Sequence, residues 1–417
     1  MSKLEQLINE LCPNGVEFKK IKNSYTRIKG TPITAGKMKE IASDDGEIKI
    51  FAGGKTVITA HEANIPNANI TRVPAVLVQS RGVIDAVYYD KPFTFKNEMW
   101  AYTADNPIKV KYLYYILKNN IGHFRQAASG MGSLPQISLR VTEDFIIPIP
   151  PLPVQEEIVC ILDKFTELTA ELTAELTAEL TARKQQYEYY KDKILTFEYD
   201  FVDWCELNDV IISLNTGLNP RKFFRLNTED AINYYVTIRE IHGGRILPTD
   251  KTDRINDEAL ALCNNRSNLE IGDVLFSGTG TIGETAVILE YPQNWNIKEG
   301  VYAIKPNKNR ILPKFLRYLL TATYIKAAYM KKVAGGTVKS IPMGELRKLK
   351  IPIPYPENKE KSLAEQQRIV GILDRFDKLC NDISEGLPAE IEARQKQYEY
   401  YRDKLLTFQE KEATENE

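Results

Sequence analysis

The most regular pattern of apolar and polar positions lies in residues 166–182, where the tetrapeptide Thr-Ala-Glu-Leu is written three full times between Thr169 and Leu180. Leu, Glu and Ala favour helix, and neither Gly nor Pro interrupts the segment. The leucines recur at every fourth position, so they follow one side of a helix that another element must cover. Because a repeat of four exceeds the helical period of 3.6, the stripe turns by about 40° per copy.

A second copy of the surrounding sequence occurs later in the chain. Residues 182–197 read ARKQQYEYYKDKILTF and residues 393–408 read ARQKQYEYYRDKLLTF, while IVCILDKF at 158–165 matches IVGILDRF at 369–376. Such self-similarity indicates a duplication. At the same offset a second apolar stripe matches the leucines, and two long helices with matching stripes are natural partners in a coiled coil. The predicted helix interface consists of Leu168, Leu172, Leu176, Leu180, Leu379, Ile383, Leu387 and Ile391.

Prolines mark the start of each long helix. The sequence IPIP occurs at 147–150 and again at 351–354, where proline excludes helix and holds an extended approach. Each helix is expected to begin near Val154 or Leu363 and to run for roughly 44 residues, or about 65 Å. Gly386 and Pro388 are expected to kink the second helix.

Fainter matches extend the duplication into the remaining segments. Residues 75–89 and 273–289 both predict a strand, a tight glycine turn and a second strand, and residues 110–117 and 313–320 both predict a short amphipathic helix. We therefore expect an α+β fold with two globular domains, each followed by a long helix, and the two helices packed as an antiparallel coiled coil with pseudo-two-fold symmetry. The expected segments are an N-terminal helix (1–15), a first domain (16–153), a central helix (154–198), a second domain (199–356), a C-terminal helix (357–410) and a tail (411–417).

Composition narrows the classes of function. The 417 residues carry a net charge of −1, which argues against a strongly basic, nonspecific nucleic-acid binder. Five scattered cysteines and three histidines form no zinc-binding pattern, so we expect neither a metal nor a disulfide. No apolar run is long enough to span a membrane, and the charged N-terminal segment does not resemble a signal peptide, so the expected location is cytoplasmic.

The sequence contains no complete motif of a catalytic site. Residues 53–56 end like a phosphate-binding loop, but Lys49 stands where its first glycine belongs. Residues 278–283 fit G-x-G-x-x-G, yet a β-rich segment follows where a dinucleotide fold needs a helix. The chain has no G-x-S-x-G, HExxH, NPPY or DPPY motif. We therefore expect no catalytic residue.

Polar, glycine-containing loops with basic flanks occur at corresponding places in both globular segments. Glycine lets a backbone approach phosphates closely, hydroxyl and amide side chains can bond phosphates or base edges, and Arg can bind guanine with two hydrogen bonds. An ordinary turn is the alternative for any one loop, but four such loops in both halves favour a binding surface. The candidate residues for contacts with phosphates or bases are Arg27, Lys29, Thr31, Lys55, Ser80, Arg81, Lys96, Ser129, Ser133, Gln136, Asn215, Thr216, Arg221, Lys222, Arg239, Arg245, Ser277, Thr279, Thr281, Lys298, Lys331, Lys332, Thr337 and Lys339.

Together, the helix entry at 147–165, the Thr-Ala-Glu-Leu array and the two QYEYY helix ends give the chain a family resemblance. It resembles the DNA-specificity (S) subunits of type I restriction-modification enzymes over essentially its whole length. The resemblance implies two target recognition domains that each read half of a bipartite, asymmetric site in double-stranded DNA. It also implies a helical spacer, two methyltransferase (M) subunits and restriction (R) subunits as partners, with S-adenosylmethionine, ATP and magnesium bound by those partners.

Two rival readings remain at this point. The first is a stand-alone DNA-modifying enzyme, which the missing methyltransferase motifs disfavour. The second is a coiled-coil adaptor with no role in DNA binding. The resemblance does not extend to base specificity, because the contact loops carry no shared motif.

Overall fold

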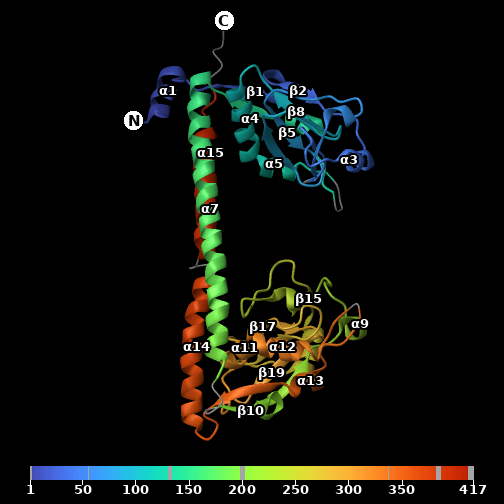
Figure 1. Cartoon of the computed structure of the whole chain (residues 1–417), viewed down its shortest axis with the longest axis vertical. Coiled ribbons are helices and arrows are strands. Elements are labelled where there is room, and N and C mark those ends of the chain that lie inside the picture. The colour runs from blue at the N-terminus through green and yellow to red at the C-terminus, as the bar shows by residue number, and fades with distance from the viewer. Residues whose placement is uncertain are drawn as a thin grey trace. The chain divides into compact units, whose positions relative to one another are not determined.

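The computed structural model describes residues 2–54, 56–129, 134–197, 202–336, 338–381 and 387–411, without the side chains of Arg221, Cys380 and Asn381. The chain divides into two compact units (Figure 1). Unit 1 contains residues Met1–Glu175 and Glu392–Glu417, and unit 2 contains Leu176–Ile391. Each unit therefore combines one α+β domain with parts of two long helices.

The long helices lie close to their expected positions. Helix α7 (Leu152–Leu195) has 44 residues. The second expected helix appears as α14 (Lys359–Asn381) and α15 (Leu387–Leu406). The segment between them, with Gly386 and the predicted interface residue Ile383, lies outside the described residues. Pro388 is the second residue of α15, where the missing N–H costs no helical hydrogen bond.

In unit 1 the α+β domain is built on two small sheets. One sheet has the strand order β2-β8-β5-β6, and the other has the order β4-β3-β7, in which β3 and β7 are parallel. A separate antiparallel pair, β1 with β9, joins the start of the domain to its end. The elements are α1 (Lys3–Leu11), β1 (Glu17–Lys20), α2 (Ile21–Ser24), β2 (Thr26–Lys29), α3 (Ala35–Ile41), β3 (Ile48–Phe51), β4 (Val57–Ala60), η1 (Glu62–Asn64), β5 (Ala75–Gln79), β6 (Asp85–Tyr89), β7 (Phe93–Phe95), β8 (Trp100–Thr103), α4 (Pro107–Asn119), α5 (Ile121–Gln126), α6 (Leu139–Glu143) and β9 (Ile146–Ile149).

Unit 2 repeats this topology. Its sheets have the orders β11-β19-β16-β17 and β15-β12-β18, with β12 and β18 parallel, and its terminal strands β10 and β20 pair antiparallel. The elements are β10 (Val202–Glu206), α8 (Leu207–Val210), β11 (Ile211–Thr216), α9 (Pro220–Phe223), β12 (Asn233–Val236), η3 (Ile238–Glu240), β13 (Ile241–His242), β14 (Arg245–Ile246), β15 (Arg254–Ile255), α10 (Asp257–Ser267), β16 (Val274–Ser277), β17 (Thr285–Val287), β18 (Trp295–Ile297), β19 (Val301–Pro306), α11 (Pro313–Thr321), α12 (Thr323–Met330), α13 (Met343–Arg347) and β20 (Lys350–Pro354). The duplication inferred from the sequence is thus a duplication of the fold.

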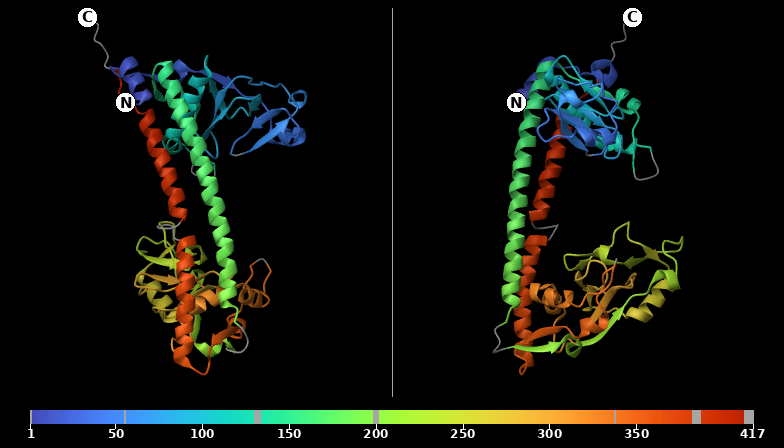
Figure 2. Two further views of the ribbon diagram at one scale, coloured as in Figure 1. Left: turned by 60° about the vertical axis from the view of Figure 1, so that its left-hand side comes forward. Right: turned by 45° about the vertical axis from the view of Figure 1, so that its right-hand side comes forward.

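In unit 1 the first part of α7 lies antiparallel to α15 (Figure 2). The ring centroids of Phe165 and Tyr401 are 6.1 Å apart, and the hydroxyl groups of Thr166 and Tyr398 are 3.0 Å apart. A later residue of α7 thus contacts an earlier residue of α15, as expected for antiparallel helices. In unit 2 the last part of α7 lies beside α14, where Tyr190 and Phe376 stack with a centroid distance of 6.3 Å.

The predicted leucine stripe is covered unevenly. Leu176 is buried, whereas the side chains of Leu168 and Leu379 are 60% and 51% exposed. Leu172, Leu180, Leu387 and Ile391 are half-buried. A stripe that turns by about 40° per repeat cannot keep every leucine against one straight partner, which accounts for this alternation.

An equivalent polar anchor ties the domain of each unit to the helix that follows it. In unit 1, Lys111 Nζ lies 2.6 Å from Asp163 Oδ2 on α7, and the Tyr115 hydroxyl donates to the same carboxylate. In unit 2, Lys314 Nζ lies 2.6 Å from Asp374 Oδ2 on α14, and the Tyr318 hydroxyl donates to Asp374 Oδ1 at 2.7 Å. Burial, and secondly the hydrogen bond to Asp374, raise the pKa of Tyr318, so its hydroxyl is protonated and donates at neutral pH.

Candidate nucleic-acid interface

In unit 1, three of the four predicted loops meet at one end of the larger sheet. Gly54 N donates to Arg81 O at 3.1 Å, and Gly82 N donates to Pro135 O at 2.9 Å. Arg81 also pairs with Gln136, which exchanges backbone hydrogen bonds of 3.0 and 3.1 Å with Ser129. The backbone thus holds the loops after β3, β5 and α5 together.

The fourth loop of unit 1 lies beside the turn that carries Lys96. Thr31 pairs in parallel with Lys96, and a Cβ atom on Gly30 would lie only 2.2 Å from Phe95 O. Unit 2 repeats both features, because Leu218 pairs in parallel with Lys298 and a Cβ atom on Gly217 would lie 1.8 Å from Ile297 O. Only glycine permits so close an approach of the two backbones.

The corresponding loops of unit 2 meet in the same way. Gly280 N donates to Lys339 O at 2.9 Å, and Thr279 pairs with Ser340, which also pairs with Ala334. The loop at 242–245 is placed differently. It forms the hairpin between β13 and β14, and Gly244 pairs with Ala286 on β17.

Four predicted contact residues lie inside the turns rather than on their surface. Thr31, Ser80 and Ser277 have no exposed surface, and Thr216 is buried. Ser80 Oγ donates to Glu98 O, Ser277 Oγ donates to Thr281 O at 2.6 Å, and Thr216 Oγ1 donates to Val301 O at 3.1 Å. In this structure these hydroxyl groups are therefore bonded within the chain, and they shape the loops from inside.

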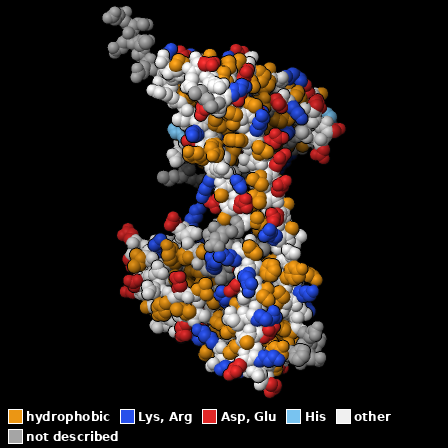
Figure 3. Space-filling model, turned by 90° about the vertical axis from the view of Figure 1, so that its left-hand side faces the viewer, with side chains coloured by type: hydrophobic (Ala, Val, Ile, Leu, Met, Phe, Trp, Pro, Cys, Tyr) orange, Lys and Arg blue, Asp and Glu red, His pale blue; other side chains and the backbone are white. Residues whose placement is uncertain are grey.

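Several predicted cations are already paired with carboxylates. The nitrogen–oxygen distances are 3.4 Å for Arg27 with Glu143, 2.9 Å for Lys96 with Glu98, and 3.2 Å for Lys332 with Glu345. In contrast, six predicted cations form no ion pair within the described part of the chain: Lys29, Arg81, Lys222, Lys298, Lys331 and Lys339. On the face shown in Figure 3, basic and acidic side chains are interspersed over each unit, in keeping with the balanced net charge.

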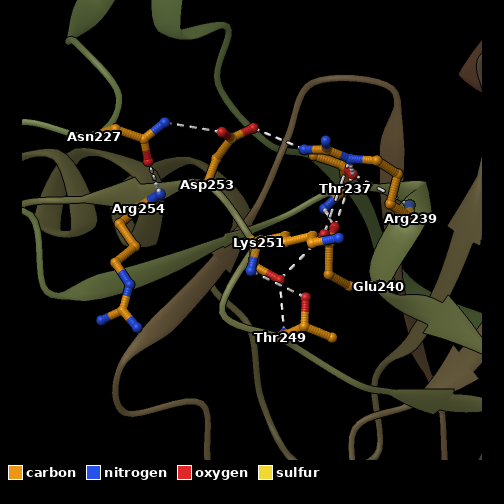
Figure 4. A network of polar contacts seen from close by, with 9 residues as sticks. Asn227, Thr237, Arg239, Glu240, Thr249, Lys251, Asp253 and Arg254 are labelled. Carbon is orange, nitrogen blue, oxygen red and sulfur yellow. Dashed lines mark hydrogen bonds and ion pairs between the residues drawn. The ribbon is translucent and has the colours of Figure 1, made fainter. Parts of the chain in front are cut away.

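Arg239 belongs to a polar network that holds the β12–β15 region together (Figure 4). Its guanidinium lies 2.8 Å from Asp253 Oδ2, and Asn227 Nδ2 donates to Asp253 Oδ1 at 3.0 Å. The buried Glu240 carboxylate accepts from Thr237 Oγ1 at 2.8 Å and from Thr252 Oγ1 at 3.3 Å. Contact with a ligand by Arg239 would therefore compete with a structural ion pair.

The remaining predicted residues differ in position. Asn215 is half-buried and donates to Ser267 O at 3.4 Å, whereas Ser129, Gln136, Arg245 and Thr281 are exposed and Thr279 is half-buried. Lys55, Ser133 and Thr337 lie outside the described residues, as does the side chain of Arg221.

A cavity of about 630 Å³ opens beside the assembled loops of unit 1. Its lining includes three predicted residues, Arg27, Lys29 and Gln136, but also Asn69, Asn97, Glu98, Trp100 and Ser138, which sequence reasoning did not select. Trp100 is fixed there because its indole N–H donates to Thr142 Oγ1 at 2.9 Å. The position of Asn97 directly after Lys96 was the one available sequence signal, since Lys96 matches Lys298 in the second copy.

Neither a metal centre nor a membrane segment emerges from the described residues. They contain no cluster of three or more His, Cys, Asp or Glu side chains that could hold a metal ion. Within the same residues, no helix is both long and apolar enough to cross a membrane.

Comparison with known proteins decides the family. The type I restriction modification DNA specificity domain matches the chain twice, at residues 17–182 and 202–393. The chain belongs to this family of DNA-specificity subunits. Its members are the DNA sequence-recognition subunits of type I restriction-modification systems and are not catalytic, which agrees with the missing enzyme motifs.

Individual relatives support the assignment. The chain is 35% identical to the specificity subunit of the type I restriction enzyme EcoR124I/EcoR124II of Escherichia coli over 384 residues, which cover 89% of this chain and 90% of that protein. It is also 35% identical to a putative type I specificity subunit of Haemophilus influenzae, with 76% and 77% of the two chains covered.

The fold agrees with this family. A chain from a solved structure concerned with complex assembly and conformational transition of the type I restriction-modification system aligns with a TM-score of 0.61 and 16% identity. The alignment covers 94% of this chain and 98% of that one. At this identity the likeness concerns the architecture of two domains and long helices.

Proposed function

We propose that each unit of this DNA-recognition subunit reads one half of a bipartite, asymmetric site in double-stranded DNA. The observation that carries the proposal is the contrast between a repeated scaffold and its side chains. Gly30 and Gly217 occupy equivalent places, yet the exposed Lys29 precedes Gly30 in unit 1, whereas the buried Thr216 precedes Gly217 in unit 2. Likewise, Gln136 in one hairpin corresponds to Ser340 in the other. Two readers of different base sequences require such a contrast.

Within this proposal, exposed cations hold the phosphate backbone and polar side chains of the loops read bases. Lys29, Arg81, Lys298 and Lys339 are suited to phosphates, because they are exposed and form no ion pair within the described residues. The buried hydroxyl groups described above fix the loops from inside. The balanced net charge fits a chain whose grip on DNA is shared with partner subunits.

The same proposal assigns two methyltransferase subunits and restriction subunits as partners. Equivalent exposed tyrosines support a partner present in two copies, because Tyr189 on α7 is 62% exposed and Tyr400 on α15 is 63% exposed. These partners would carry S-adenosylmethionine, ATP and magnesium. The helices would set the distance between half-sites, and the Thr-Ala-Glu-Leu array would adjust it.

The experiment is selection from random DNA by the chain assembled with its methyltransferase subunits. The proposal expects enrichment of one sequence made of two specified parts separated by a gap of fixed length. A single continuous motif would disprove the bipartite reading, and no enrichment would favour an adaptor. Methyl transfer by the purified chain alone would favour a stand-alone enzyme.

A further inference from the structure

Two amide side chains line the unit 1 cavity on fixed backbones, and neither forms a hydrogen bond to the described part of the protein. Asn97 and Gln136 are exposed and line the cavity from two different loops. Within the described residues neither side-chain amide makes a hydrogen bond. Their backbones, however, are fixed, because Gln136 pairs with both Ser129 and Arg81, and the turn around Asn97 closes with Met99 N donating to Lys96 O at 3.0 Å.

The other polar groups of the cavity are engaged. Asn69 Nδ2 donates to Lys29 O at 2.6 Å, Glu98 pairs with Lys96, and Arg27 pairs with Glu143. Consequently the two amides, together with the Lys29 ammonium and the Ser138 hydroxyl, are the groups left to bind a ligand among the described polar side chains of the lining.

Unit 2 provides an internal comparison. The residue after Lys298 is Glu299, where Asn97 follows Lys96, and Ser340 takes the place of Gln136 in the paired hairpin. Strand β11 places Leu214 and Thr216 opposite Ile304 and Tyr302, as β2 places Arg27 and Lys29 opposite Tyr102 and Trp100. The two amides and two cations are therefore specific to unit 1.

The chemistry of an amide specifies its ligand. One N–H donor and one carbonyl acceptor on a planar group match the N7 acceptor and N6 donor that adenine presents in the major groove. Neither a phosphate, which only accepts, nor the guanine edge, which presents two acceptors, uses both groups of the amide. The fixed backbone at both positions lowers the entropy lost on binding, so that only the side-chain rotamers have to be ordered, while the free amide keeps its donor and acceptor available for a base.

We infer that Gln136 reads an adenine in the half-site recognised by unit 1, with Asn97 contacting a neighbouring base edge and Lys29 an adjacent phosphate. The inference rests on the proposed function and adds to it the residue and the base that determine specificity in one half-site. It also implies that the half-site of unit 2 is read by different chemistry.

The test uses the chain assembled with its methyltransferase subunits and a DNA pool randomised across the site. In Gln136→Ala, preference for adenine at one position of one half-site should fall by about 5- to 150-fold, the range for loss of a bidentate contact. In Gln136→Glu the same position should change its preference to cytosine, because a carboxylate accepts from cytosine N4. Lys29→Ala should weaken binding to all sequences alike.

Gln126→Glu is the matched control, because Gln126 is an exposed glutamine of the same unit outside the cavity. If a variant keeps the wild-type base preference in the half-site of unit 2, it is folded and assembled. The inference fails if Gln136→Ala and Gln136→Glu keep the adenine preference, even where the wild-type complex selects a bipartite site and the proposed function stands. If the wild-type complex selects no bipartite sequence at all, the proposed function is refuted instead.

Discussion

Asp374 on helix α14 is expected to stabilise the contact between this helix and the domain of unit 2. In Asp374→Ala, the buried Tyr318 hydroxyl loses its acceptor at 2.7 Å and Lys314 loses its partner. A hydrogen bond to a charged group contributes about 1.5–3 kcal/mol. The ion pair adds only about 0.2–1 kcal/mol, because both side chains are more than a third exposed. The free energy of local opening should therefore fall by about 2–4 kcal/mol, so that opening becomes roughly 30- to 900-fold more frequent.

Amide hydrogen exchange measured by mass spectrometry can localise this effect. Peptides from α11 and α14 should exchange faster in Asp374→Ala, whereas peptides from α4 in unit 1 should be unchanged. Asp163→Ala, the equivalent change in unit 1, should give the reverse pattern. Lys314→Met removes the ion pair but keeps the acceptor of Tyr318, so its effect should be at most about 1 kcal/mol.

The sign of the pH dependence follows from the same bond. Since the pKa of Tyr318 in the folded chain lies above its ordinary value of 10.0, the stabilisation is fully present at neutral pH and is lost only as the pH rises beyond that value. The protective effect of Asp374 should therefore be constant between about pH 6 and 9. Equal exchange in Asp374→Ala and wild type, or equal effects in both units, would refute the anchor.

Two further predictions concern DNA recognition. Deleting Thr173–Leu176 removes one repeat, or about 6 Å of helix, whereas one base pair of DNA spans about 3.4 Å. The gap between half-sites should therefore shorten by about one to two base pairs, and both half-sites should persist in the selected sequences. An unchanged gap would show that the array does not set the spacing. Arg81→Ala and Lys339→Ala should each weaken binding and reduce the slope of log affinity against log salt by about one, as measured by titration at several salt concentrations; unchanged affinity and slope in both would remove these loops from the interface.

The repeated architecture was predictable because helix periodicity and near-identical helix ends survive in the sequence. The helix expected near Val154 begins at Leu152, and the strand–turn–strand motifs predicted at 75–89 and 273–289 are confirmed as β5–β6 and β16–β17. The proline-marked approaches also form strands, β9 and β20, as their extended character indicated.

The contact surface was less predictable, because sequence does not tell which way a side chain points in a tight turn. Ser80 and Ser277 have loop-like neighbours, yet their hydroxyl groups turn inward to backbone carbonyls. The place of Asn97 in the cavity was not predictable, because Gln136, which lines the same cavity, lies 39 positions further along the chain and comes near only through strand pairing. The equivalence of Gly30 and Gly217 was likewise hidden, since it depends on close contact with β7 and β18.

The central claim is that each unit reads its own half-site, and domain exchange tests it most directly. Residues 16–150 would be replaced by the corresponding segment of another family member with a known target, and the assembled complex would be used for selection from random DNA. The account predicts a new sequence in one half-site, an unchanged sequence in the other and an unchanged gap. A change in both half-sites, or in neither, would contradict it.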